Sequence, residues 1–243
     1  MPARDDTDIG GPHQKFPATR QSAIAAAGST DPAERLWALD FLVAAYWKPT
    51  YKYIRMKWRE SNENAKDLTQ SFFARAIEKD FFRSYDDSKA SFRTFIRVCV
   101  DAFVANELKF ASRQRRVGDS DSLPLDFEMP DDSDMDTYFQ KEWVASLFGM
   151  AVDRLENECN ARNKTIHFQL FERYDLSDAH EHQPMTYAQL ASEFGISSTD
   201  VTNYLCWVRR EFRRIVLDSL RQVTGTEREF RDEARLLFGV ESL

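Results

Sequence analysis

The chain has 243 residues, of which 42% are hydrophobic, and its formal net charge is −7. This length and composition can bury a substantial core, and they suit two small domains better than one large domain. No apolar run is long enough to span a bilayer, and the acidic N-terminus lacks the basic start and apolar segment of a secretory signal. We therefore expect a cytoplasmic protein with no membrane insertion.

The three cysteines, Cys99, Cys159 and Cys206, are far apart in the sequence and odd in number. Two of them have aliphatic or aromatic neighbours in helical patterns, which is typical of small buried residues in a reducing compartment. No disulfide is predicted.

The predicted elements are helical, because no segment of any length alternates with the period of a strand, and the fold class is all-α. Residues 1–30 are expected to form a tail of low order. A helical domain then spans residues 31–116 and opens with Asp31 as a helix cap and Pro32 at the first helical position. In this first helix Pro49 allows a break or kink.

Two further helices complete this first domain. One is predicted from Asn62 to Lys79, and its inward side consists of Leu68, Phe72, Phe73, Ala76 and Ile77. The longest helix follows a polar turn, and its apolar side consists of Phe92, Phe95, Ile96, Cys99, Val100, Phe103, Val104 and Leu108. The same stretch is rich in basic residues, which are Lys89, Arg93, Arg97, Lys109, Arg113, Arg115 and Arg116. Only Asp101 and Glu107 oppose them, so the segment carries a basic face.

Residues 117–137 carry the opposite charge. The segment from Gly118 to Asp136 contains eight acidic residues, two prolines and no lysine or arginine. Such a composition buries too little apolar surface to fold by itself. We therefore predict an extended, flexible, acidic linker between two helical domains.

The second helical domain is expected over residues 138–224, and it contains two helices joined by a tight turn. Thr186 and Gln189 fit a capping box at the start of the first of these helices. Gly195 suits the turn and Ser197 caps the second helix. The second helix has one apolar face, which consists of Val201, Leu205, Val208 and Phe212.

This pattern is typical of a helix-turn-helix, which lays its second helix in the DNA major groove. The residues that face outward on the second helix are Thr199, Asp200, Thr202, Asn203 and Cys206. A basic cluster follows them and consists of Arg209, Arg210, Arg213 and Arg214. The alternative is a helical hairpin that packs against another part of the protein.

Residues 225–243 are predicted to add an amphipathic helix at the C-terminus. Its apolar side consists of Phe230, Ala234, Leu237 and Phe238. We expect this helix to pack on the second domain, and the alternative is that it contacts an inhibitor.

The histidines His180 and His182, with His167 and Cys159 nearby in the sequence, are candidates for a metal cluster. Their spacing matches no strong metal signature, and their polar neighbours are typical of a surface loop. The sequence also lacks a glycine-rich phosphate loop and a nucleophile elbow. We therefore predict no metal, no cofactor and no enzyme activity.

Three segments resemble those of a known family. Residues 67–75, Asp-Leu-Thr-Gln-Ser-Phe-Phe-Ala-Arg, are similar to region 2.2 of bacterial sigma factors. Residues 92–95, residues 105–107 and the basic run that ends at Arg116 resemble regions 2.3 and 2.4. Residues 186–214 resemble region 4.2. By the order and separation of these segments, the chain resembles an RNA polymerase sigma factor of the extracytoplasmic-function type.

The resemblance implies that the chain binds bacterial core RNA polymerase and directs promoter recognition, promoter melting and transcription initiation. The residues implied in binding the polymerase are Asp67, Leu68, Gln70 and Ser71. For Asp67, the alternative is a helix cap or a first-turn acid. The acidic linker is either a spacer or an RNA mimic in the polymerase cleft. An anti-sigma factor as a further partner stays open.

Two sets of residues are implied in binding promoter DNA. Those for the minus-ten element are Arg93, Arg97, Asn106, Lys109, Phe110, Arg113, Arg115 and Arg116. Those for the minus-thirty-five element are Thr199, Asp200, Thr202, Asn203, Cys206, Arg209, Arg210 and Arg213. Relatives often have lysine or arginine after the position of Val201, where this chain has Thr202, Asn203 and Tyr204, so no promoter sequence is predicted. The rival hypothesis is a stand-alone helix-turn-helix regulator that binds duplex DNA without polymerase.

Overall fold

The computed structural model describes residues 22–116, 132–177 and 185–239, and these residues contain helices and no strand. The predicted all-α class is therefore confirmed for this part of the chain. The α-helices are α1 (Ala23–Ala26), α2 (Pro32–Lys57), α3 (Asn62–Glu78), α4 (Phe92–Arg116), α5 (Asp132–Ala161), α6 (Thr165–Phe171), α7 (Tyr187–Phe194), α8 (Ser198–Gln222) and α9 (Glu227–Phe238). A 3₁₀ helix, Phe81–Ser84, follows α3, and a π-helix, Glu172–Leu176, follows α6.

Part of the predicted N-terminal tail is helical. Ser22 caps α1 by accepting a hydrogen bond from the backbone N–H of Ala25, and Ala23 and Ala26 are fully buried. The small alanine side chains let α1 approach α2 closely. The expectation of low order is therefore wrong for residues 22–30, whereas residues 1–21 lie outside the described part.

The helix α2 continues through Pro49, where the sequence allows a break. A proline in a helix interior removes one backbone hydrogen bond and costs about 3 kcal/mol. Pro49 itself is buried, and so are Tyr46 and Tyr53 on either side of it. Burial of this whole face of α2 in one core offsets the loss at Pro49.

The first core forms where α2, α4 and the first half of α5 meet. Trp143 of α5 lies 6.3 Å from the ring of Tyr46 in α2, and Phe92 of α4 packs edge-on against Tyr46 at 5.6 Å. One turn nearer the start of α5, the ring of Phe139 meets Tyr53 edge-on at 5.3 Å. Helices from both sides of the acidic segment therefore share a single core.

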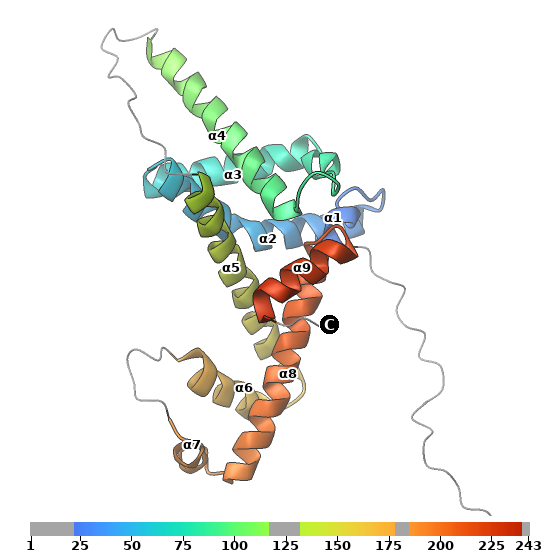
Figure 1. The fold of residues 1–243 in the computed structure, drawn as a ribbon, viewed down its shortest axis with the longest axis vertical. Coiled ribbons are helices and arrows are strands. Elements are labelled where there is room, and N and C mark those ends of the chain that lie inside the picture. Colours follow the sequence, from blue (N-terminus) through green and yellow to red (C-terminus); the bar gives the residue numbers. More distant parts are fainter. Residues whose placement is uncertain (1–21, 117–131, 178–184, 240–243) are drawn as a thin grey trace, which may run out of the picture.

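The second core contains the second half of α5 together with α6, α7 and α8. Its buried residues are Ala151, Leu155, Cys159, Phe168, Leu170, Phe171, Leu190, Ala191, Val201, Leu205, Val208, Ile215 and Val216. The far end of α8 then enters the first core through Leu220. Thus α5 and α8 run side by side from one core to the other (Figure 1).

These cores do not follow the predicted division into domains. The acidic segment 117–137 was expected to separate two folding units, but α5 begins at Asp132 and its first half completes the first core. Residues 117–131 lie outside the described part. The boundary that packing creates runs across the middle of α5, because Leu147 belongs to the first core and Ala151 to the second.

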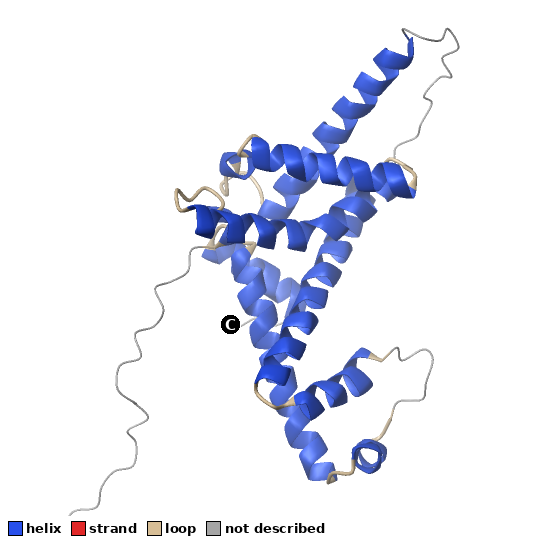
Figure 2. Cartoon of the chain, turned by 180° about the vertical axis from the view of Figure 1, so that it is seen from behind, coloured by secondary structure: helices blue, strands red, loops and turns tan. Residues whose placement is uncertain are grey.

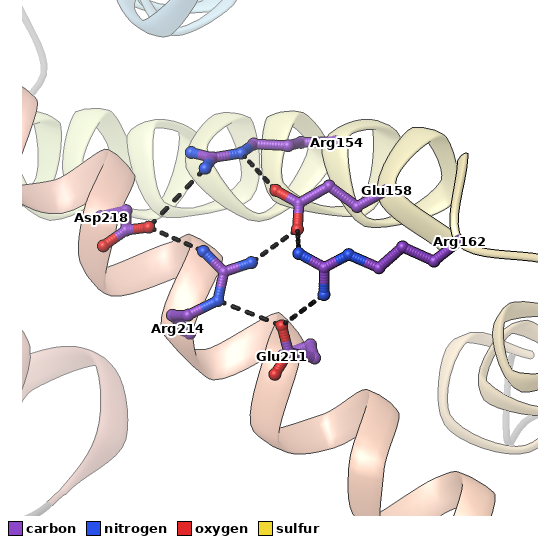
Figure 3. A network of polar contacts seen from close by, with 6 residues as sticks. All are labelled: Arg154, Glu158, Arg162, Glu211, Arg214 and Asp218. Carbon is purple, nitrogen blue, oxygen red and sulfur yellow. Dashed lines mark hydrogen bonds and ion pairs between the residues drawn. The ribbon is translucent and has the colours of Figure 1, made fainter. Parts of the chain in front are cut away.

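Charged side chains line the contact between α5 and α8 (Figure 3). Arg214 of α8 lies 2.6 Å from Glu158 of α5 and also pairs with Glu211 and Asp218 at 3.2 and 3.0 Å. Arg154 of α5 and Arg162, the residue after α5, bind the same carboxylates from the other side. Isolated pairs at this exposure contribute little, but a network of six alternating charges fixes the relative position of two helices.

The position of Trp143 predicts how much the first core depends on α5. Trp143→Ala should lower the free energy of unfolding by about 3–5 kcal/mol, because the side chain is 1% exposed and its loss leaves a cavity. Denaturant unfolding measures the change, and Leu36→Ala, at a site that is 61% exposed, is the control. A loss below about 1 kcal/mol for Trp143→Ala would contradict the packing of α5 on α2.

Candidate nucleic-acid interface

The helix α3 presents a polar face to solvent. Asp67, Gln70 and Ser71 are exposed, Leu68 is half-buried, and Phe72 faces the first core. This is the arrangement predicted for the residues implied in polymerase binding. One detail differs, since the neighbouring inward residue Ile77 was expected to be buried but is 36% exposed.

Asp67 has no capping role in α3. The N-cap is Ser61, whose hydroxyl accepts a hydrogen bond from the backbone N–H of Asn64 at 3.2 Å, and the first-turn acid is Glu63. Asp67 lies in the second turn of the helix, so the alternative of a cap or first-turn acid is wrong. Within the described residues, its carboxylate has no hydrogen bond or ion pair that would explain it structurally.

The C-terminal part of α4 projects beyond α3 in both views of the chain (Figures 1 and 2). We name as the α4 tip the four exposed candidates Asn106, Lys109, Phe110 and Arg113. Phe110 is 57% exposed, so this aromatic ring lacks most of the stabilisation that burial would give it. An exposed ring between two cations suits unpaired bases, which stack on aromatics while cations hold their phosphates. Arg115 and Arg116 lie in the helix, but their side chains are outside the described part.

The N-terminal part of α4 is different, because its two arginines are engaged. Arg93 pairs with Glu233 of α9 at 2.7 Å and lies over the ring of Trp143 at 4.9 Å. Arg97 pairs with Asp101 at 3.2 Å and also with Asp136 of α5. Their side chains are only 16% and 13% exposed, so both are engaged inside the protein in this conformation, and their binding to minus-ten DNA stays a prediction.

Asp101 gathers several donors beside Arg97. The amine of Lys57 lies 3.0 Å from its carboxylate, and the hydroxyl of Tyr53 donates to it at 2.9 Å. Burial raises the pKa of the Tyr53 hydroxyl, so it stays a donor at neutral pH. Asp101, one of the two acids that interrupt the basic run of α4, thus organises a buried polar cluster that the apolar pattern alone does not predict.

The helices α7 and α8 are joined by the turn that the sequence predicts. Gly195 ends α7 with φ of 65°, a conformation that favours glycine. The Thr186–Gln189 capping box is present, and Ser197 caps α8. The predicted inward residues of α8 are buried except Phe212, which is half-buried.

Most outward residues of α8 are exposed, namely Thr199, Thr202, Asn203, Cys206, Arg210 and Arg213. We name these six residues the α8 outer face. Asp200 does not belong to it, because its carboxylate accepts hydrogen bonds from the hydroxyl and backbone N–H of Ser197 at 2.6 and 3.2 Å. Asp200 thus completes a capping box, and a contact between its carboxylate and DNA stays an untested prediction.

The basic cluster of α8 is largely committed to contacts within the protein. Arg209 binds Asp175 of the π-helix through two hydrogen bonds of 2.8 and 2.9 Å, and this pairing raises the pKa of its guanidinium. Arg213 lies over the ring of Phe238 at 4.9 Å. Arg209 is thus paired within the protein, and its predicted contact with phosphate stays untested. Arg210 is exposed and has no ion pair within the described residues.

The candidates for a metal cluster do not come together in the described residues. His180 and His182 lie outside the described part, and no group of three or more metal-ligating side chains is found elsewhere in it. His167 stacks on Tyr204 at 4.0 Å, and burial lowers the pKa of its imidazole. Cys159 lies in the second core, where burial raises the pKa of its thiol. All three cysteines are free.

Sequence reasoning missed Glu229 and Glu233, which link α9 to α4. They lie next to Phe230 and Ala234 and have the same spacing of four residues. The sequence did contain a signal for this contact, because the two acids border the apolar side of the helix. Acids in that position lie close to the element against which the apolar side packs. The expectation that α9 packs on the second domain was only partly right, because Phe230 and Ala234 belong to the first core.

Comparisons with known proteins add no relative to this description. No protein family model matches the chain, and neither a curated protein nor a solved structure matches it. Among the described helices, none has the length and apolar character needed to cross a membrane.

The capping box of α8 predicts a structural role for Asp200. Asp200→Ala should lower the free energy of unfolding by about 1 kcal/mol, because Ser197 loses its reciprocal partner and the helix N-terminus loses a negative charge. Thermal and denaturant unfolding measure the change, with Thr199→Ala at the neighbouring exposed position as control. Equal stability of the two variants would show that Asp200 is free for another partner.

Proposed function

We propose that this chain is a sigma factor that binds bacterial core RNA polymerase in the cytoplasm and directs promoter recognition, promoter melting and transcription initiation. The observation that carries the proposal is the α4 tip, where an exposed phenylalanine lies between cations on a projecting helix. Polymerisation chemistry then belongs to the partner enzyme.

The α4 tip has the chemistry that strand separation requires. A melted strand loses its base stacking, and each base that stacks on a protein aromatic regains about 1–3 kcal/mol. Phe110 offers such a ring, while Lys109 and Arg113 hold the phosphates on either side of it. Asn106, one turn before Phe110, adds an amide that recognises base edges.

The polar face of α3 supports the second part of the proposal, a contact with the polymerase. Asp67 and Gln70 are exposed on a helix whose other side is anchored in the first core by Phe72 and Phe73. A rigid helix that presents an unpaired carboxylate suits a basic partner surface, because the charge is already positioned. The α3 face and the α4 tip lie on neighbouring helices.

The α8 outer face supports the reading of duplex DNA at the minus-thirty-five element. Thr202 and Asn203 are exposed in the first turns of α8, where a recognition helix contacts base edges. Arg210 provides a free cation for the phosphate backbone. With most neighbouring arginines committed inside the protein, this contact depends less on charge than the contact at the α4 tip.

A stand-alone helix-turn-helix regulator is the second candidate. It is favoured by the same exposed α8 outer face, which needs no polymerase to bind a duplex. It does not explain why Phe110 is exposed or why Asp67 has no partner within the described residues.

The deciding experiment adds the purified chain to core RNA polymerase that lacks any sigma factor. We expect a stable complex in gel filtration and initiation from promoters near its own gene. Binding to duplex DNA by the chain alone, with no polymerase complex, would reject the sigma hypothesis in favour of the regulator.

Asp67→Ala should weaken the complex with core polymerase roughly tenfold, as expected when a charged contact is lost at an interface. Glu78→Ala is the matched control, because it removes an exposed carboxylate from the same helix. Titration of labelled chain with polymerase measures both affinities. Equal weakening by the two variants would indicate a general effect of charge and no specific contact at Asp67.

Phe110→Ala should slow promoter opening and weaken binding to single-stranded DNA by about 1–3 kcal/mol, because a stacking platform is lost. Val98→Ala serves as control, since Val98 is a 50% exposed apolar residue of the same helix outside the α4 tip. Stability should change little in either variant. Full binding by Phe110→Ala would exclude the tip as the surface that holds the melted strand.

A further inference from the structure

The helix α9 closes over the N-terminus of α4. One carboxylate oxygen of Glu229 accepts a hydrogen bond from the backbone N–H of Phe92 at 2.8 Å. The other oxygen accepts from the backbone N–H of Gly225 at 2.7 Å and from the hydroxyl of Tyr85 at 3.2 Å. The first N–H groups of a helix lack partners within the helix and attract negative charge, so Glu229 fills a position that α4 itself leaves open.

One turn further along α9, Glu233 engages the first arginine of α4. Its carboxylate lies 2.7 Å from the guanidinium of Arg93, and its side chain is 8% exposed. Breaking such a pair from one side leaves a buried charge without a partner, which is costly. The pair therefore holds α9 and α4 together only while both charges are present.

The apolar side of α9 contacts both cores, because Leu237 packs against each of them and Phe238 packs against the second. Phe230 and Ala234 enter the first core, and Arg221 of α8 lies 4.2 Å from the centre of the Phe230 ring. The turn into α9 also fits tightly, because a Cβ at Gly225 would lie 2.8 Å from the ring of Tyr85. That ring cannot move freely, since it packs edge-on against Phe92 at 5.0 Å.

The guanidinium of Arg93 cannot pair with the Glu233 carboxylate and with a phosphate at the same time. The α4 tip ends near Arg113, twenty residues beyond Arg93, so the two sites lie about 30 Å apart along one helix. With α9 docked, Lys109 and Arg113 of the tip are the free cations among the described side chains of α4. With α9 released, the guanidinium of Arg93 becomes available to a phosphate near the N-terminus of α4, on the opposite side of the helix from Lys109 and Arg113.

We propose that α9 is an autoinhibitory segment of this chain, which must leave α4 before Arg93 can bind a nucleic-acid phosphate. The inference rests on the proposed function, because it assigns α4 as the helix that binds nucleic acid. In the docked state the carboxylates of Glu229 and Glu233 occupy the places of phosphates. Release opens the N-terminal part of α4 and withdraws Leu237 and Phe238 from the second core.

The test uses the full-length chain and two charge reversals in α9. Glu233→Arg places like charges together at Arg93 and should release α9, whereas Glu227→Arg makes the same charge change at an exposed residue of the same helix. Gly225→Ala is an independent variant that disturbs the docked turn against Tyr85 and adds no charge. It also decides the outcome if Glu233→Arg does not fold.

Two measurements follow, and only one of them depends on nucleic acid. Hydrogen–deuterium exchange of residues 92–97 should be faster in Glu233→Arg and Gly225→Ala than in wild type and Glu227→Arg. Binding to a fluorescent single-stranded oligonucleotide of mixed sequence, measured by anisotropy, should become roughly fivefold tighter or more in the same two variants. The slope of log affinity against log salt should steepen by about 0.7, as one more phosphate is neutralised.

The outcomes separate the inference from the function on which it rests. Unchanged exchange at residues 92–97 in the folded variants overturns the inference, whatever the chain binds. Faster exchange with no gain in affinity over Glu227→Arg also overturns it, because release then exposes no binding site. If no variant, nor wild type, binds the oligonucleotide although exchange is faster, α9 docks as described but the proposed nucleic-acid function fails.

Discussion

The packing of α5 against α2 is the constraint on which the rest of the structure depends. Trp143 fills the space between Tyr46 and Arg93, and no other described side chain of that volume lies as fully buried. Because α5 is one continuous helix of 30 residues, fixing its first half fixes the position of its second half. The second core, which forms on that second half, is placed relative to α4 in the same step.

The same packing also decides which positive charges remain available for binding a partner. The basic residues of α4 and α8 divide into those that lie beside a packed helix and those that project away from the body. The first group contains Arg93, Arg97 and Arg209, and each of them forms an ion pair with a carboxylate. Lys109 and Arg113 belong to the second and are exposed. Net charge and charge runs describe both groups alike, yet only the second can take part in binding without rearrangement.

A shared core also changes how the acidic residues function. In the sequence, acids around Asp136 form part of a tether, and the acids of α9 form part of an added helix. In the structure, Asp136 and Glu233 approach α4 from two different helices and neutralise adjacent arginines. The same ion pairs therefore stabilise the fold and limit access to the candidate nucleic-acid surface. A partner that takes over these arginines must also compensate for the contacts that α9 gives up.

The sequence by itself determined the features that depend on neighbours within a few residues. Helical class, the caps at Thr186 and Ser197, the turn at Gly195 and the exposure of Asp67 and Phe110 follow from local propensity and the helical period, which act within one or two turns. Only the tertiary structure decided that α2 passes through Pro49, that α5 joins the first core, and that Arg93 is paired with Glu233. That last pair joins residues 140 positions apart. Its formation depends on how helices α5 and α9 pack against α4, and neither residue's local sequence carries that geometry.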